Sequence, residues 1–162
     1  MAIPESELGM IKYDPDTGNF SWAYWRFGLT NKTECGNINA NGYKCLCINR
    51  KKYYAHRVAW EIVHGEIPDG LDIDHKNGIR SDNRIANLRL ATRSQNLSNA
   101  GRRSDNSSGY KGVSRTATGR WRATIQWHGK RKHIGSFDTA EAAFEAYAHE
   151  AERQRGEFAR VH

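Results

Sequence analysis

Leu71-Asp72-Ile73-Asp74-His75-Lys76-Asn77-Gly78 alternates apolar and polar residues and then enters a turn sequence. Alternation with a period of two indicates a strand, and Asn-Gly after such a strand is a strong hairpin signal. Residues 85–90 can supply the return strand, and Thr92-Arg93-Ser94-Gln95 has the capping-box pattern that begins a helix. The sequence therefore predicts a hairpin followed by a helix, with His75 at a strand end and Asn96 in the first helical turn.

Four polar residues of this unit have the chemistry of a phosphodiester-cleaving centre: Asp74, His75, Asn87 and Asn96. Hydrolysis needs a base that takes a proton from water and a cation that neutralises charge on the phosphate. Histidine is largely neutral at physiological pH, and carboxylate and amide oxygens suit hard cations such as Mg²⁺. Because adjacent residues of a regular strand face opposite sides, Asp74 and His75 share a site only if the strand end is irregular. The pattern predicts a metal-dependent nuclease centre.

These residues resemble the HNH endonucleases, in particular the variety of bacteriophage genomes and homing endonucleases in which the last metal ligand is Asn. The resemblance extends to three neighbouring stretches, residues 56–60, 65–70 and 82–89. It implies a ββα-metal finger with Asp74 as a metal ligand, His75 as the general base, Asn87 as the residue that orients the histidine loop, and Asn96 as the second metal ligand. The implied cation is Mg²⁺, and Mn²⁺ would fit the same ligands.

Two further polar residues near the motif have competing interpretations. Asn83 is expected to be a turn residue with an Asx hydrogen bond, and a role in the site is the alternative. His56 opens a helix-like segment, residues 56–64, and is expected to be structural, with contact to DNA or to the metal site as the alternative. Four further histidines have no partner pattern and are expected to be surface or packing residues: His64, His128, His149 and His162.

Positive charge is concentrated in residues 102–133, which hold nine Lys or Arg against one acid, in a chain of net charge +7. The stretch is interleaved with Tyr110, Trp121 and Trp127, and such a mixture favours binding to phosphates, sugars and bases. Residues 121–127 alternate with a period of two. Their polar face carries Arg122, Thr124 and Gln126, which could reach base edges in a groove.

The flanking segments complete a small predicted domain. Residues 109–115 and 132–137 are expected to be the other two strands, and Asp138 with Glu141 forms a capping box for a helix that Gly156 ends. One face of that helix carries apolar residues at helical spacing and is expected to be core: Ala140, Ala143, Phe144, Tyr147, Ala148 and Ala151.

This carboxy-terminal part resembles the plant ethylene-response-factor (Apetala-type) DNA-binding domain, a three-stranded antiparallel sheet packed on one helix. The resemblance runs from Gly109 to about Ala159, through Tyr-Lys-Gly-Val, Gly-Arg-Trp-Arg-Ala-Thr-Ile and Gly-Ser-Phe-Asp-Thr-Ala-Glu-Ala-Ala. Departures such as Ser114, Thr116 and His133 mean that the plant target sequence is not implied. By position, the resemblance implies DNA contacts by Arg115, Arg120, Arg122, Thr124, Gln126, Arg131 and His133.

The remaining segments give a linker and a strand-rich start. Residues 98–108 are rich in Asn, Ser, Gly and Arg and are expected to be a linker, in which Arg102 and Arg103 either hold DNA phosphates or are simply solvated. Residues 10–13, 19–26, 36–38 and 43–48 are expected to be strands, and the segment from Tyr13 to Trp22 is similar to the start of phage HNH proteins. The aromatic residues of this region are expected to fill a small core rather than bind bases: Trp22, Trp25, Tyr43 and Tyr53.

Composition favours a cytosolic, modular chain of 162 residues. No stretch approaches the ~18 apolar residues of a membrane span, and a secretion signal is not expected. Cys35, Cys45 and Cys47 are an odd number without metal-site spacing and are expected to be reduced. The expected location is the cytoplasm, or that of the host cell if the chain is phage-encoded.

The sequence thus predicts an α+β protein with a strand-rich segment (1–54), an HNH finger (55–100), a linker (101–108) and a DNA-binding domain (109–162). The expected function is metal-dependent hydrolysis of duplex DNA, by nicking if the chain acts as a monomer, with no membrane and no obligate protein partner. A non-catalytic DNA-binding regulator is the main alternative, and an RNA nuclease is a weaker one.

Overall fold

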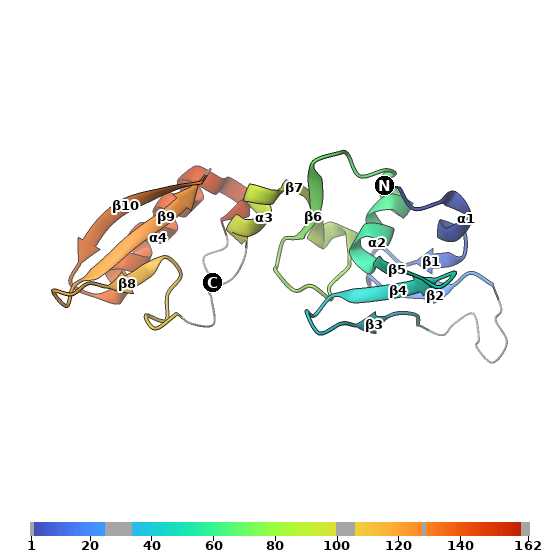
Figure 1. Cartoon of the computed structure of the whole chain (residues 1–162), viewed down its shortest axis with the longest axis horizontal. Helices are drawn as coiled ribbons and strands as arrows, with labels where there is room; N and C mark the ends of the chain where they lie inside the picture. The colour runs from blue at the N-terminus through green and yellow to red at the C-terminus, as the bar shows by residue number, and fades with distance from the viewer. Residues whose placement is uncertain (1, 25–33, 100–105, 128, 160–162) are drawn as a thin grey trace. The chain divides into compact units, whose positions relative to one another are not determined.

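The computed structural model describes residues 2–24, 34–99, 106–127 and 129–159 (Figure 1). The chain divides into two compact units, Met1–Ala91 and Thr92–His162. Each unit combines helices with small antiparallel sheets, so the predicted α+β class is confirmed. The first unit contains both the predicted strand-rich segment and the hairpin of the predicted finger.

The first unit is built from short elements that share one core. Helix α2 packs against β4, β5 and β6, and the core runs through all of them, with Leu46, Ile48, Val58, Ala59, Ile73 and Leu88 buried. Its elements are α1 (Glu5–Leu8), β1 (Ile11–Tyr13), β2 (Phe20–Trp22), β3 (Asn37–Ile38), β4 (Lys44–Ile48), β5 (Lys51–Tyr54), α2 (Ala55–His64), β6 (Leu71–His75) and β7 (Leu88–Thr92). The sheets are β1-β2, β3-β4-β5 and β6-β7. The strand-rich start is therefore packed with the hairpin.

The predicted hairpin is present, but its return strand begins later than expected. Residues Ile85–Asn87 form a turn of 3₁₀ helix, and β7 begins only at Leu88. The amide of Ile85 donates to the Pro15 carbonyl, 3.0 Å away, so this amide is not available to a β6-β7 ladder. Residues 85–87 consequently belong to the loop, and the prediction of a strand from residue 85 was wrong.

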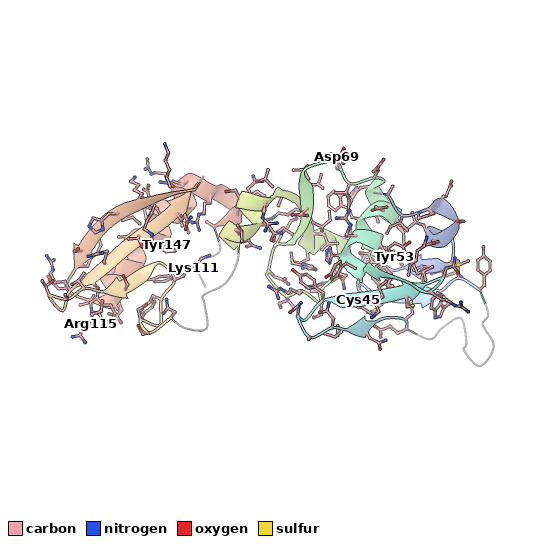
Figure 2. All side chains as sticks on the ribbon, in the orientation of Figure 1. Cys45, Tyr53, Asp69, Lys111, Arg115 and Tyr147 are labelled. Atoms are coloured by element: carbon pink, nitrogen blue, oxygen red, sulfur yellow. The ribbon has the colours of Figure 1, made fainter. Side chains whose placement is uncertain are left out.

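The second unit is a sheet covered by a helix. It comprises α3 (Arg93–Asn99), β8 (Val113–Arg115), β9 (Trp121–Trp127), β10 (Lys130–Phe137), α4 (Ala140–Arg155) and the 3₁₀ turn Gly156–Phe158. The sheet order is β10-β9-β8, and Ala143, Tyr147 and Ala151 of α4 join Ala123 and Ile125 of β9 in one buried cluster (Figure 2). Small alanines let the helix axis approach the sheet closely. The predicted order of three strands and a helix is confirmed.

Three boundaries in the second unit differ from the prediction. The first strand begins at Val113 instead of Gly109, and the third begins at Lys130 instead of Lys132. The cap of α4 is Thr139, whose Oγ1 accepts from the Ala142 amide at 3.1 Å, and not Asp138, whose carboxylate lies 3.1 Å from Arg120 Nε. A hydroxyl at the residue directly before the helix reaches the amide three positions on. The predicted cap at Thr92 is confirmed, since its Oγ1 accepts from the Gln95 amide at 3.3 Å.

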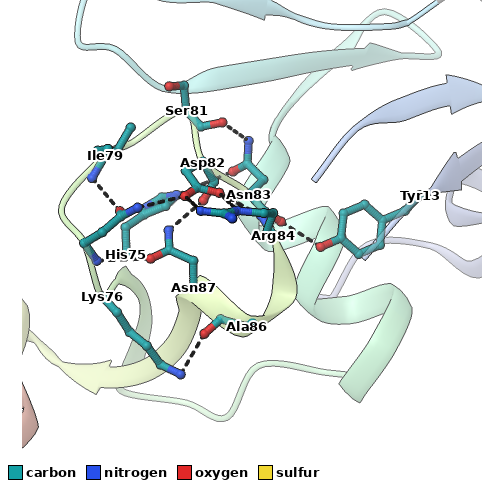
Figure 3. A network of polar contacts seen from close by, with 11 residues as sticks. Tyr13, His75, Lys76, Ile79, Ser81, Asp82, Asn83, Arg84, Ala86 and Asn87 are labelled. Carbon is teal, nitrogen blue, oxygen red and sulfur yellow. Dashed lines mark hydrogen bonds and ion pairs between the residues drawn. The ribbon is translucent and has the colours of Figure 1, made fainter. Parts of the chain in front are cut away.

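The hairpin β1-β2 braces the loop that follows His75. Tyr13 Oη donates to the Asn83 carbonyl at 2.6 Å (Figure 3), and Gly18 lies against the same peptide. A Cβ added at Gly18 would stand 2.6 Å from the Arg84 amide nitrogen and 2.7 Å from the Asn83 carbonyl carbon. This close approach, at a φ of +73°, accounts for glycine in the turn and gives the strand-rich start a structural role.

We predict that Gly18→Ala lowers the free energy of unfolding by more than ~3 kcal/mol, because backbone strain and a backbone clash add together. The matched control is Gly42→Ala, which has a similar φ of +81° but nothing within 4 Å of the added Cβ. It should cost only the strain, about 1–2 kcal/mol. Chemical denaturation measures both, and equal losses would contradict the bracing contact.

Candidate active site

The end of β6 places Asp74 and His75 at the start of a closed loop. Both side chains are buried. The His75 carbonyl accepts from the Gly78 amide at 2.8 Å, and the Lys76 amide donates to the Asn87 carbonyl at 2.8 Å. Strand β6 therefore ends at His75, where the chain turns, and the loop returns to the same point at Asn87.

The Asn87 side chain joins the two ends of this loop to its middle. Its Oδ1 accepts from the Asn77 amide at 3.0 Å, and its Nδ2 donates to the Asp82 carbonyl at 2.8 Å (Figure 3). Asn87 is buried, so these bonds replace those that water would make. A side chain with one acceptor and one donor group in this position holds the loop in a single conformation.

A charged cluster stiffens the outer part of the loop. Asp82 accepts from Arg84 Nε at 2.8 Å and from Asn77 Nδ2 at 2.7 Å. The hydrogen bonds from Arg84, together with those from the Arg84 amide and Asn77, lower the pKa of Asp82 to about 2. Asp82 is therefore fully ionised at neutral pH and its charge is matched within the loop.

Asn83 faces His75. Its Oδ1 lies 3.5 Å from His75 Nε2, at the outer limit of a hydrogen bond, and its Nδ2 donates to the Ser81 carbonyl at 3.0 Å. The side chain is only 1% exposed. The bond to Ser81 is donated by the side chain to a carbonyl, so it is not the Asx hydrogen bond expected of a turn residue, whereas the contact with the histidine is the one that the alternative interpretation requires.

The carboxylate of Asp74 is held by a residue that the sequence analysis did not single out. Arg89 Nε donates to Asp74 Oδ2 at 2.9 Å, and Arg89 Nη2 lies 2.8 Å from the same oxygen. Both side chains are buried. The signal in the sequence was Leu88-Arg89-Leu90, because an arginine between apolar residues of a buried strand needs an acidic partner.

Asp74 and His75 have different neighbours, as alternation along a strand requires. Asp74 meets Arg89 of β7, whereas His75 meets Asn83 of the loop and the ring of His56. The turn begins only at His75, and these contacts place the two side chains on opposite sides of the strand.

His56, which was expected to be structural, packs its ring edge-on against His75. The centroids are 5.1 Å apart and the planes are inclined by 78°. Burial, reinforced by the nearby His75 and Arg57, lowers the pKa of His56 to about 3. Burial also lowers the pKa of His75. Both rings are neutral at pH 7, which is the form that a general base requires.

The remaining predicted ligand and linker residues lie in the second part of the chain. Asn96 is a half-buried residue of α3 and belongs to the second unit. Arg102 and Arg103 lie outside the described residues. Within the described ranges there is no cluster of three or more His, Cys, Asp or Glu that could hold a metal ion. A ligand pair of one carboxylate and one amide is a different donor set, which Mg²⁺ accepts alongside water.

Five of the seven residues predicted from the resemblance to contact DNA share one face of the second unit's sheet. Arg122, Thr124 and Gln126 alternate with buried Ala123 and Ile125 along β9, so they face away from α4. Their cross-strand partners on β10 share that face, with Arg131 opposite Gln126 and His133 opposite Thr124. We call this set the outer face: Arg122, Thr124, Gln126, Arg131 and His133.

Arg115 and Arg120 do not belong to the outer face. Arg115 pairs with Trp121 across the strands, and its guanidinium lies 5.8 Å from the centre of the Trp121 ring, at the end of β8 (Figure 2). Arg120 donates to the Ser136 carbonyl at 3.0 Å and pairs with Asp138. These two arginines are already engaged at the edge of the sheet.

The aromatic residues of the first unit have mixed environments. Trp22 and Tyr53 pack on the core, as expected, and the Tyr53 hydroxyl donates to Glu7. Tyr43 instead lies in contact with the rings of His56 and His75, and Trp25 lies outside the described residues. The three cysteines are free thiols. No helix in the described ranges is long and apolar enough to span a membrane.

Comparison with known proteins agrees with this geometry. The family model described as HNH endonuclease matches residues 53–98, which contain α2, β6, the closed loop and β7. The chain is 36% identical over 107 residues to protein 3.8 of Escherichia phage T7, across 65% of this chain and 87% of that protein. The chain belongs to the HNH endonuclease family. An uncharacterized HNH endonuclease, L560 of Acanthamoeba polyphaga mimivirus, is 34% identical over 109 residues, across 67% of this chain and 56% of that relative.

A solved structure also resembles this HNH endonuclease. It is the HNH homing endonuclease I-HmuI, described as binding and cleaving DNA, with 23% identity and a TM-score of 0.46. The match covers 59% of this chain and 53% of that one. The chain therefore spans about half the length of both I-HmuI and the mimivirus relative.

We predict that His56 makes the stability of this HNH endonuclease fall in acid. Below pH ~6.5 the unfolded chain protonates His56 while the folded protein does not, so stability declines by up to ~1.4 kcal/mol per pH unit. The decline from this residue ends near its folded pKa of about 3. His56→Phe lacks this contribution. Chemical denaturation at pH values from 7.5 to 4 should therefore show that its free energy of unfolding falls less steeply than that of the wild type.

The same variant should be about 1 kcal/mol more stable than the wild type at pH 7.5. His56 Nδ1 is buried without a hydrogen-bond partner among the described residues, and phenylalanine removes that cost. His149→Phe, at an exposed position of α4, is the control and should keep the wild-type profile. Parallel profiles for His56→Phe and wild type would refute the assignment.

Proposed function

We propose that this HNH endonuclease hydrolyses phosphodiester bonds of duplex DNA with His75 as the general base. The observation that carries the proposal is the buried His75 at the strand end, kept neutral by burial and fixed between Asn83 and His56. Water is the nucleophile, and His75 takes its proton as the oxygen attacks phosphorus. The 3′ oxygen of the substrate leaves.

The donor chemistry of the site fits a divalent cation, Mg²⁺ or Mn²⁺. Asp74 supplies a carboxylate whose orientation Arg89 fixes, and Asn96 is the second ligand expected from the resemblance. A bound cation would neutralise charge on the phosphate and on the leaving oxygen. Asn87 acts as a positioning residue, because its side chain closes the loop that sets the position of His75.

Two features of the neutral His75 ring suit proton transfer. When Nε2 carries the proton and points at the Asn83 amide oxygen, the lone pair lies on Nδ1. Asn83 therefore selects the tautomer as well as the ring orientation, as carboxylates or carbonyls do for other catalytic histidines. One such centre per chain cuts one strand, so a monomer nicks and two chains or two events cut both strands.

The outer face of the second unit's sheet is proposed to hold the DNA. Its residues are exposed except for the half-buried Thr124, and it combines two arginines with groups able to donate to and accept from base edges. Arg122 and Arg131 have no carboxylate partner among the described ion pairs, so their charge is available to phosphates. Duplex DNA is favoured over RNA because a two-stranded or three-stranded ribbon fits the major groove of B-form DNA.

The nuclease assignment predicts nicking of supercoiled plasmid in Mg²⁺ or Mn²⁺ and none in EDTA. His75→Ala should lower the nicking rate by at least about 100-fold, since a general base contributes on the order of 10²–10⁴. His149→Ala removes an exposed histidine remote in sequence and should nick at the wild-type rate. Gel shifts must show that His75→Ala still binds DNA.

The rival function is that of a DNA-binding regulator without catalysis. The proposed DNA-binding sheet favours it. Retention of plasmid without nicking in either metal would select this rival and reject the proposed hydrolysis.

The proposed DNA-binding face predicts different effects for two adjacent residues of β10. Arg131→Ala should weaken DNA binding and reduce the slope of log affinity against log salt by about 1, because one phosphate contact is lost. Lys132→Ala is the matched control. Lys132 faces the other side, where its Nζ lies 2.7 Å from Glu150 of α4, so its loss should leave the slope unchanged. Equal slopes for both variants would count against this face.

A further inference from the structure

An exposed aromatic cluster adjoins the proposed general base. Tyr54, at the junction of β5 and α2, stacks on His56 with a centroid distance of 5.4 Å and an inclination of 24°. Tyr43 contacts Tyr54 edge-on at 5.4 Å and approaches His75 at 6.0 Å. The four rings of Tyr43, Tyr54, His56 and His75 therefore form one continuous group that leads from the protein surface to the base.

Tyr54 is fixed in place yet open to solvent. It is 44% exposed, and its hydroxyl makes no hydrogen bond within the described part of the chain. The preceding residue offers a contrast, because Tyr53 is half-buried and its hydroxyl donates to Glu7. A rigidly held aromatic ring loses little entropy when a ligand stacks on it, and every nucleobase presents a flat face for such stacking.

A cation without an acidic partner lies beside the same cluster. The guanidinium carbon of Arg80 is 4.9 Å from the centre of the Tyr43 ring, and its Nη1 donates to the Asn41 carbonyl at 2.8 Å. Arg84 and Arg89, the next two arginines, are paired with Asp82 and Asp74. Arg80 has no carboxylate partner among the described residues, and its side chain is exposed. Its position is set by the cluster while its charge is left for a ligand.

We propose that Tyr54 and Arg80 form a nucleotide subsite beside the scissile phosphate. The Tyr54 ring stacks on the base of a flanking nucleotide, and the Arg80 guanidinium binds a neighbouring phosphate of the same strand. Both groups lie near His75, the proposed general base. The aromatic ring matches the nucleobase of a nucleotide, and the guanidinium matches its phosphate. Tyr43 and His56 are positioning residues that hold the two groups. The subsite rests on the proposed function of His75.

The test is steady-state nicking of supercoiled plasmid by the full-length protein with Mg²⁺. Tyr54→Leu should raise KM about tenfold with little change in kcat, as expected for the loss of one stacked base. Tyr54→Phe keeps the ring and should restore the wild-type KM. Tyr24→Leu, at a tyrosine of the same unit that is 67% exposed and outside the cluster, is the control and should leave KM unchanged.

Arg80→Ala tests the phosphate-binding half of the subsite separately, because it leaves the Tyr54 side chain in the protein. It should raise KM severalfold and lower the salt slope of plasmid binding by about 1. Wild-type KM in both Tyr54→Leu and Arg80→Ala, with His75→Ala inactive, would overturn the subsite and leave the nuclease standing. A wild-type chain that does not nick would overturn the proposed function and the subsite together.

Discussion

The two hydrogen bonds of the Asn87 side chain are the constraint on which the proposed active site depends. They tie the amide of Asn77 and the carbonyl of Asp82 to one buried residue, so the loop after His75 has one conformation. The β1-β2 hairpin adds a second support through Tyr13 and Gly18. With the loop fixed, Asn83 is held against His75, and the imidazole does not need to be ordered when substrate arrives. A general base is more effective when its side chain is already positioned before the substrate binds.

Burial of two histidines at the proposed active site lowers the stability of the fold. His56 and His75 are both taken out of water, which disfavours their charged forms. Phenylalanine at position 56 would avoid the cost of burying a polar ring nitrogen. The pair of buried imidazoles therefore makes this part of the core less stable than an apolar core would be. Such departures from maximum stability are concentrated at functional sites. Asp74 is buried as well, and Arg89 pairs with its carboxylate in the interior.

Sequence reasoning was most accurate where the pattern is local. The strand at Leu71–His75, the cap at Thr92 and the three strands and helix of the second unit follow from alternation, turn residues and capping, which involve neighbours in the chain. It was least accurate where a distant segment intervenes. The bond from Ile85 to Pro15 delays β7, and no local signal in residues 85–87 reveals it. The contacts of Arg89 with Asp74 and of His56 with His75 depend on packing between elements, and the division of Arg115 from Arg122 depends on the register of the sheet.

The proposed metal-assisted centre at the end of β6 is tested most directly by a titration of ¹⁵N-labelled protein with Mn²⁺, followed by NMR line broadening. We expect the signals of Asp74 and His75 to broaden first. Asp74→Ala should weaken the effect at both positions, while Asp69→Ala, at an exposed acid of the loop before β6, should not. Broadening that spares Asp74 and His75, or that survives in Asp74→Ala, would contradict a metal-assisted centre at this strand end.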